Sequence, residues 1–353
     1  MGFSDLWKKI TQTPSFQPTR IFISDEHTDK ADQLKNSIIT AEKDYFTVRV
    51  NEMYLSYSSK WFSTFDPVVF VVSEFIYGGQ RRVVPFVVGP AMLKGKMENL
   101  PEGMIFSNTT VAGTHPYKGD SLALTIVLSQ VKQTDYLQKF IEMIESTAAT
   151  YMMDFATMVN DYIKVAKVVM KGMENLMGME ETTPIVGFRK EINPNAGDDF
   201  KPGYSVLINK DQSTLQESMF WVKNDRLFYG NSLETAVPYR DCDYVLYSIM
   251  KTTARNDTST LFSAVWDDVK NYAIKEAFIS DDKWQIIKSR MFGLQCVLTS
   301  SPDLTQPQAD ILWEYYVAEI KKIRASKDQL GDAVSKATLD DFDKKALDTL
   351  NNL

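Results

Sequence analysis

The chain has 353 residues, of which 44% are hydrophobic and 24% charged, so it can bury a sizeable core in one large domain or in two. Its net charge of −7, with no basic cluster longer than a pair, argues against a nucleic-acid-binding face. Two cysteines and two histidines, none closely paired, predict neither a structural zinc site nor a disulfide framework. These totals favour a cytoplasmic protein.

The first 19 residues form an amphipathic N-terminal segment. Its apolar side chains recur at helical spacing beside two lysines, and prolines then end any helix. Such a stripe can bind a partner, lie on a membrane surface, or dock on its own domain. The segment has no secretory core, and the chain has no window apolar enough for a transmembrane helix. The predicted partner-binding residues are Phe3, Leu6, Trp7 and Ile10.

Residues 20–255 are predicted to form a β-rich core. From Arg20 to about Val131, β-branched and aromatic residues alternate in runs that are typical of strands. Two apolar runs flank Gly78-Gly79, a pair suited to the positive φ angles of a tight turn. We expect a hairpin with strands at 67–77 and 81–88.

The end of this hairpin carries a spacing similar to a phosphate-binding loop. Gly89 is followed by Gly95-Lys96, as in G-x-x-x-x-G-K. Met97 then stands where a magnesium-ligating Ser or Thr is needed, and Pro101 interrupts the helix that should follow. The stretch therefore predicts an exit from a strand into a loop, not a nucleotide site.

A long helical stretch interrupts the β-structure. Apolar residues recur every three or four positions at about 134–178, which predicts one long helix or two abutting helices. Strand patterns resume at Pro184 and continue to about Met250, with a hairpin turn at Asn224-Asp225. Pairing the two β-regions gives one sandwich, with the long helix crossing outside it.

Residues 256–353 are predicted to form a C-terminal helical domain. Runs of strands followed by runs of helices indicate an α+β fold, not a parallel doubly wound sheet. We therefore expect an antiparallel β-sandwich-like core, a long crossing helix and a helical bundle. The predicted helices of the bundle are 258–276, 281–298, 306–325 and 338–351.

The stretch "AGTHPYKGDS", residues 112–121, holds one of the two histidines. His115 could act as a general base with Asp120 orienting it, since imidazole titrates near neutral pH. The glycines and proline around it favour a histidine in a tight turn. Partner binding through Tyr117 and Lys118 is an equal alternative for this loop.

Neither cysteine has the sequence surroundings of a nucleophile. Asp241 and Asp243 flank Cys242 and would raise its pKa, so entry into a buried strand is the favoured interpretation. Cys296 falls on an apolar helix face and is predicted to be core. The loop at 193–199 offers oxygen donors but lacks the EF-hand spacing, so a solvated turn is favoured over a calcium site.

The sequence predicts no cofactor, no metal site and no catalytic constellation. The leading hypothesis is a non-enzymatic interaction or assembly module in the cytosol, bound to a protein partner or to further copies of itself. One alternative is a membrane-associated effector of a bacterial conflict or secretion system, acting through the N-terminal segment. Another is an enzyme of unfamiliar type that uses His115 or Cys242.

Overall fold

The structure is a computed structural model of the chain. The chain divides into two compact units, residues 1–257 and 258–353, which are described separately below. The described residues are 18–56, 65–77, 79–89, 104–132, 134–135, 137, 139–140, 143, 159–179, 182–255, 261–275 and 282–336. Residues 1–17 of the amphipathic segment, the stretch around Lys96, most of the predicted 134–178 helix before Val159 and the predicted helix at 338–351 lie outside them.

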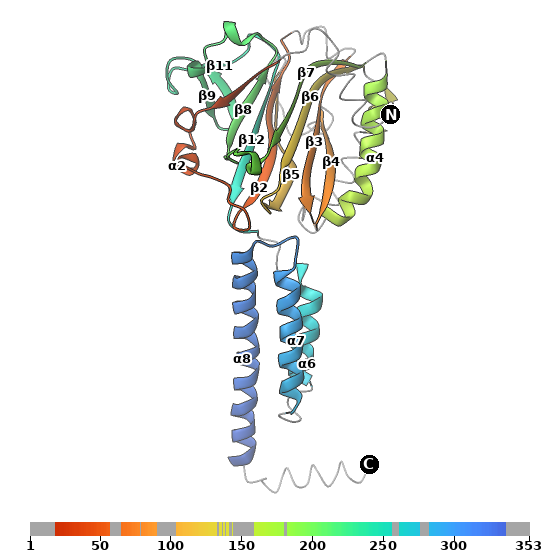
Figure 1. Ribbon diagram of the computed structural model, residues 1–353, viewed down its shortest axis with the longest axis vertical. Coiled ribbons are helices and arrows are strands. Elements are labelled where there is room, and N and C mark those ends of the chain that lie inside the picture. Colours follow the sequence, from red (N-terminus) through yellow and green to blue (C-terminus); the bar gives the residue numbers. More distant parts are fainter. Residues whose placement is uncertain are drawn as a thin grey trace. The chain divides into compact units, whose positions relative to one another are not determined.

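Unit 1 is built from antiparallel strands joined by short helical turns and one longer helix (Figure 1). Its strands are β1 (Thr19–Ile23), β2 (Tyr45–Tyr54), β3 (Phe65–Tyr77), β4 (Gln80–Val88), β5 (Met104–Pro116), β6 (Leu122–Lys132), β7 (Thr182–Ile192), β8 (Gly203–Ile208), β9 (Phe220–Lys223), β10 (Arg226–Tyr229), β11 (Val237–Pro238) and β12 (Tyr244–Thr252). Its short helical elements are η1 (Asp25–His27), α2 (Ala31–Leu34), η4 (Pro194–Ala196), η5 (Gln212–Thr214) and η6 (Glu217–Met219).

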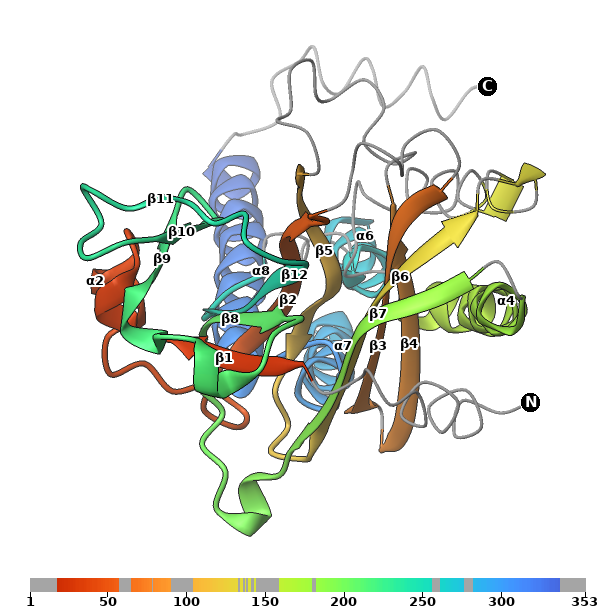
Figure 2. The same cartoon turned by 90° about the horizontal axis from the view of Figure 1, so that it is seen from above.

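Two antiparallel sheets face each other across the main core (Figure 2). The first sheet has the order β1-β8-β12-β2-β5, and the second has the order β4-β3-β6-β7. Each sheet takes strands from both β-regions of the sequence. Apolar side chains from the inner faces of the two sheets interlock in a single buried cluster. The sandwich-like α+β fold predicted from the sequence is therefore confirmed.

A helix covers the outer face of the four-stranded sheet. α4 (Val159–Gly178) lies beside β4, on the side away from the other sheet (Figure 2). Its buried residues Val169, Met173 and Leu176 pack on outward-facing residues of β3, β4 and β6. Phe140, from the helical stretch before α4, joins the same cluster. The α4 methionines Met173 and Met177 are thus core residues of this layer.

A small third sheet covers the outer face of the five-stranded sheet. β9, β10 and β11 form this sheet in the order β11-β10-β9. Buried residues of β9 and β10 meet those of β1, β8 and β12 in a third apolar cluster, which Leu34 of α2 completes. The β9–β10 turn is the predicted Asn224-Asp225 hairpin, and both residues have positive φ angles, as a tight turn requires.

Unit 2 is a bundle of three helices within its described residues. These helices are α6 (Ser263–Lys275), α7 (Asp282–Thr299) and α8 (Gln306–Lys336), and each packs on the other two. Trp266, Ile287, Leu294 and Tyr316 are among the side chains buried between them. Among the described residues, no helix combines the length and the apolar composition needed to cross a bilayer.

Two details of the elements differ from the sequence predictions. α8 continues to Lys336, whereas the apolar spacing predicted an end at residue 325. The residues after 325 contain no proline, so no backbone N–H is lost and no ring blocks the continuation of the helix. The predicted 67–77 and 81–88 hairpin is present with slightly longer strands, and β4 ends at Val88.

Candidate functional site

A β-bulge in β2 brings two polar residues to the same face of the five-stranded sheet. Both neighbouring strands skip Asn51: β12 pairs Leu246 with Glu52 and Tyr247 with Val50, and β5 shifts register at the same place. A bulge interrupts the alternation of a strand and redirects a side chain. Asn51 and Glu52 consequently both lie under the β9–β10 hairpin, and both are buried.

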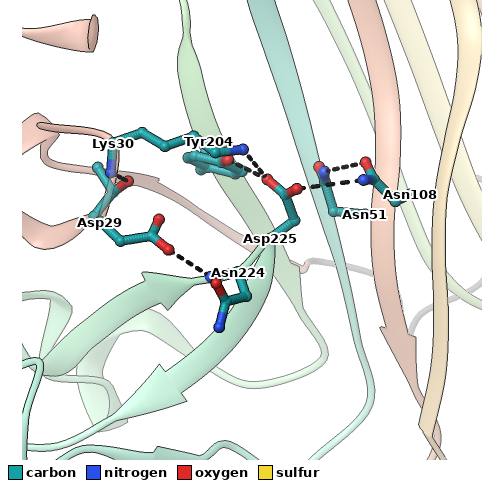
Figure 3. Close-up of polar contacts among 8 residues, drawn as sticks. Asp29, Lys30, Asn51, Asn108, Tyr204, Asn224 and Asp225 are labelled. Carbon is teal, nitrogen blue, oxygen red and sulfur yellow. Dashed lines mark hydrogen bonds and ion pairs between the residues drawn. The ribbon is translucent and has the colours of Figure 1, made fainter. Parts of the chain in front are cut away.

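A polar network connects this bulge to the turn of the hairpin (Figure 3). Asp225 accepts hydrogen bonds from Lys30 Nζ at 2.5 Å and from the Tyr204 hydroxyl. Its other oxygen accepts from Asn108 Nδ2 at 3.3 Å, and Asn108 Oδ1 accepts from Asn51 Nδ2 at 3.2 Å. The network therefore links β2, β5 and β8 to the β9–β10 turn and to the loop before α2.

The charges of this network support one another. Burial alone would raise the pKa of Asp225, but the hydrogen bonds from Lys30 and Tyr204 outweigh it and hold the pKa below its usual value. Burial, together with the Asp225 carboxylate that its hydroxyl faces, raises the pKa of Tyr204. Asp225 is thus an ionised acceptor whose donors come from the protein itself, an arrangement suited to holding the hairpin in place.

Glu52 fastens the same hairpin from below. Its side chain is fully buried and accepts from the Leu227 backbone N–H at 2.8 Å, Arg226 Nε at 3.1 Å and the Tyr244 hydroxyl at 3.0 Å. Burial raises the pKa of Glu52, and the three hydrogen bonds offset part of that effect. The bonds give both carboxylate oxygens a partner within the fold, so Glu52 joins the five-stranded sheet to the small third sheet.

An open apolar groove lies among the described residues of unit 2. It lies between α7 and α8, has a volume of about 390 Å³, and is within the size range of ligand sites in proteins. Its lining residues are Trp284, Ile287, Lys288, Met291, Phe292, Gln295, Trp313, Val317, Ile320, Lys321 and Arg324.

The groove has an apolar floor and a positive rim. Trp284, Ile287 and Met291 are buried at its base, whereas the Phe292 side chain beside them is 66% exposed. The charged residues of the lining are Lys288, Lys321 and Arg324, and the lining contains no carboxylate. Since the chain as a whole is acidic, this rim is a local reversal of charge.

His115 does not occupy the predicted turn. It lies in β5, is 4% exposed, and packs against the rings of Phe75 and Phe46 at centroid distances of 4.4 and 5.9 Å. Burial, assisted by the nearby Arg255 cation, lowers the pKa of His115 to about 3. At neutral pH it is an uncharged and weakly basic core residue.

The reason for this correction is the role of Gly113. A Cβ at Gly113 would lie 2.6 Å from the Phe46 carbonyl oxygen, and its φ is +111°. The glycine therefore allows β5 to approach β2 closely, so the strand continues to Pro116. The turn comes later, at Gly119, whose φ is +88°.

Two of the residues predicted to bind a partner, Tyr117 and Lys118, lie among the described residues. Tyr117 is buried, with its ring 4.9 Å from that of Phe200. The Lys118 ammonium pairs with Glu42 at 2.8 Å. Phe3, Leu6, Trp7 and Ile10 lie outside the described residues.

The two cysteines lie in different surroundings, since Cys242 is partly buried and Cys296 is exposed. Cys242 precedes β12 with its sulfur 3.2 Å from the Tyr239 hydroxyl, and burial raises its pKa, so the thiolate is disfavoured. Cys296 is exposed, so the prediction that it belongs to the core is wrong. α7 carries apolar residues on several sides, so the apolar spacing alone did not identify which side of the helix is buried.

The loop at 193–199 closes on itself. The Asn193 backbone N–H donates to Asp198 Oδ2 at 2.9 Å, and the loop contains the short η4 turn. Within the described ranges, no group of three or more His, Cys, Asp or Glu side chains is placed to hold a metal ion.

Comparison of the chain with protein-family models, with curated proteins and with solved structures finds no match. The described fold defines the chain as an antiparallel α+β sandwich protein with a C-terminal helical bundle.

Sequence reasoning missed both the polar network and the groove. The bulge had a weak signal, because Asn51-Glu52 places two polar residues in succession within an alternating strand. The groove had none, since its lining residues come from two helices and their shared face depends on how the helices pack. Lys288 and Arg324, for example, are 36 residues apart in the sequence (324 − 288).

Proposed function

We propose that this protein is a non-enzymatic interaction module that binds an amphipathic helix of a partner protein in the α7–α8 groove. The proposal rests on one observation, the exposed apolar groove with three cations and no carboxylate in its lining. The two free cysteines are compatible with a reducing compartment, and we place the module in the cytoplasm.

The shape of the groove favours a helix as its occupant. Its lining residues on α7 extend from Trp284 to Gln295, about three helical turns. An amphipathic helix inserts apolar side chains at spacings of three and four into a groove of this kind. Phe292 is available at the edge to pack on such a helix, because most of its side chain is exposed.

The charge of the rim favours an acidic partner. Lys288 and Lys321 have no ion-pair partner among the described side chains, and the Arg324 guanidinium lies over the Trp284 ring at 5.3 Å. Opposite charges across an interface steer association and select among partners. A second copy docking the same groove would bring like charges together, so we assign the occupant to a different, acidic helix.

The test uses the full chain and two synthetic peptides of about 20 residues, long enough to hold a helix in water. Both carry leucines at helical spacing; the remaining face is glutamate in one peptide and lysine in the other. We expect the acidic peptide to bind at least about tenfold more tightly, measured by fluorescence anisotropy at low salt. Equal binding of the two peptides, or no saturable binding, would overturn the proposal.

Matched variants locate the binding. Phe292→Asp should abolish it, whereas Ile311→Asp, also exposed on α8 but outside the groove, should leave it unchanged. Lys321→Glu should weaken binding of the acidic peptide about tenfold, and Lys275→Glu on α6 should not.

Two outcomes would point to a different occupant of the groove. If the chain forms a dimer and Phe292→Asp dissociates it, the occupant is a second copy and the proposal is wrong. Tighter peptide binding after deletion of residues 337–353 would instead identify the chain's own C-terminal segment as the occupant.

A further inference from the structure

A second, smaller pocket lies where the two sheets of unit 1 meet at an open edge. Its volume is about 170 Å³, below the size of sites for drug-sized ligands. Its lining comes mainly from the edge strand β1, its neighbour β8 and the strand β7 of the opposite sheet. These three strands are labelled in Figure 2. Its lining residues are Arg20, Phe22, Lys190, Ile192, Asp199, Lys201, Gly203, Ser205 and Ile249.

The alternation of β1 directs Arg20 into this pocket. Ile21 and Ile23 are buried in the cluster under the small third sheet. Successive side chains of a strand point to opposite faces, so Arg20 and Phe22 face the other sheet. Gly203 allows this, because a Cβ there would lie 2.7 Å from the Phe22 ring.

The Arg20 guanidinium is held in a fixed orientation without a carboxylate. Its Nε donates to the Tyr247 hydroxyl at 2.9 Å and its Nη2 donates to the Ser205 hydroxyl at 2.9 Å. Its Cζ lies 5.6 Å from the centroid of the Phe188 ring. A guanidinium has five N–H donors, so three remain, and no described carboxylate pairs with it.

The neighbouring charges leave the pocket positive. The Lys190 side chain has no hydrogen-bond or ion-pair partner among the described residues. Lys201 pairs with Asp199 at 3.3 Å, but both side chains are more than half exposed, so this pair is weak. Lys201 also faces the Asp25 carboxylate. The lining thus holds three cations and one carboxylate, in a chain whose net charge is negative.

The two hydroxyls that orient Arg20 can also serve a ligand. Ser205 and Tyr247 are 3% and 2% exposed, and both oxygens accept from Arg20. Each hydroxyl hydrogen is then available to donate. A fixed guanidinium, two hydroxyl donors and a free ammonium match the several acceptor oxygens of a phosphate group. Phe22, Ile192 and Ile249 supply apolar surface beside them.

We propose that this edge pocket binds the phosphate group of a small phosphate monoester, with Arg20 and Lys190 as its principal ligands. The volume excludes a nucleotide, and the apolar part of the lining accommodates a short apolar body next to the phosphate. The pocket shares no lining residue with the α7–α8 groove, so this proposal does not depend on the proposed function.

The test is calorimetric titration of the full chain, at low ionic strength, with inorganic phosphate and with phenyl phosphate. We expect saturable binding of both, tighter for phenyl phosphate. Arg20→Gln and Lys190→Gln should each lower the affinity about tenfold or more, as expected for loss of a charge-assisted hydrogen bond. Lys223→Gln, the same charge change at an exposed position on β9, should leave the affinity unchanged.

Arg20 also holds β1 to its neighbours, so if Arg20→Gln unfolds, Lys190→Gln decides, because the Lys190 side chain has no described partner. Flotation with phosphatidylcholine vesicles, with and without phosphatidic acid, separates a lipid phosphate from a free one. Absence of saturable binding to every phosphate, or equal affinities for Lys190→Gln and Lys223→Gln, would overturn the proposal.

Discussion

At the residue scale, two buried polar side chains, Glu52 and His115, are stabilised in the core in different ways. Glu52 remains in a fully buried position because three donors converge on it. His115 has no such partners: its Nδ1 makes no hydrogen bond in the described structure, and aromatic rings surround it. A neutral imidazole tolerates that environment, whereas an imidazolium does not.

The buried His115 predicts a loss of stability in acid. Its pKa is about 3 in the folded chain, and an exposed histidine in the unfolded chain has a pKa near 6.5. Between these values the unfolded state binds more protons, so the free energy of unfolding falls as the pH falls from about 6.5 towards 3. The slope from this residue is at most about 1.4 kcal/mol per pH unit.

The variant His115→Phe should remove that contribution while leaving stability near pH 7 within about 1 kcal/mol, because the pocket is already aromatic. Urea unfolding of both proteins at a series of pH values measures the two slopes. If the variant kept the wild-type slope over this window, His115 would not be buried as described.

At the element scale, two helical glycines have opposite roles. A Cβ at Gly172 of α4 would lie 2.0 Å from Cε2 of the buried Phe140 ring, so the glycine allows the two helical stretches to approach closely. A Cβ at Gly293 of α7 would meet nothing within 4 Å. The sequence shows two glycines within helical patterns and does not distinguish them.

The same substitution should therefore have opposite effects at these two positions. Gly172→Ala should lower the free energy of unfolding by about 1–3 kcal/mol through overpacking, and Gly293→Ala should raise it by about 0.5–1 kcal/mol through helix propensity. Urea unfolding of the full chain measures both changes. Adding Phe140→Ala should relieve part of the Gly172→Ala penalty, and strict additivity of the two substitutions would refute the proposed contact.

At the scale of the whole molecule, each compact unit has buried clusters of its own. Val245 is fully buried in the sandwich cluster of unit 1, and Leu294 is fully buried in the cluster of unit 2. Folded units with separate cores open as separate cooperative regions. We therefore expect each unit to have its own free energy of unfolding. One proposed binding site lies in each unit.

Core truncations should then act within the unit that contains them. Leu294→Ala should destabilise unit 2 by about 2–5 kcal/mol and raise amide exchange in α6, α7 and α8. Val245→Ala should raise exchange in the strands of the five-stranded sheet. Hydrogen-exchange mass spectrometry of the full chain resolves the two patterns. Faster exchange in β8 and β12 caused by Leu294→Ala would show that the units do not open separately.

The sequence by itself determined the class of fold, because strand and helix periodicities are local properties. The alternation around Val48 and the turn at Asn224-Asp225 predicted antiparallel strands, and the proline-free apolar spacing predicted the helices. It also argued against a phosphate-binding loop, through Met97 and Pro101, on chemical grounds, and this stays a prediction because the stretch lies outside the described residues.

The tertiary structure alone decided where the chemistry lies, because the binding surfaces combine residues that are distant in sequence. Arg20 and Lys190 meet only when the edge of one sheet faces the other, and Trp284 meets Arg324 only when α7 and α8 are antiparallel. His115 shows the same limit from the opposite direction. Its neighbours in the chain indicate a turn, but strand pairing permitted by Gly113 buries it in the core.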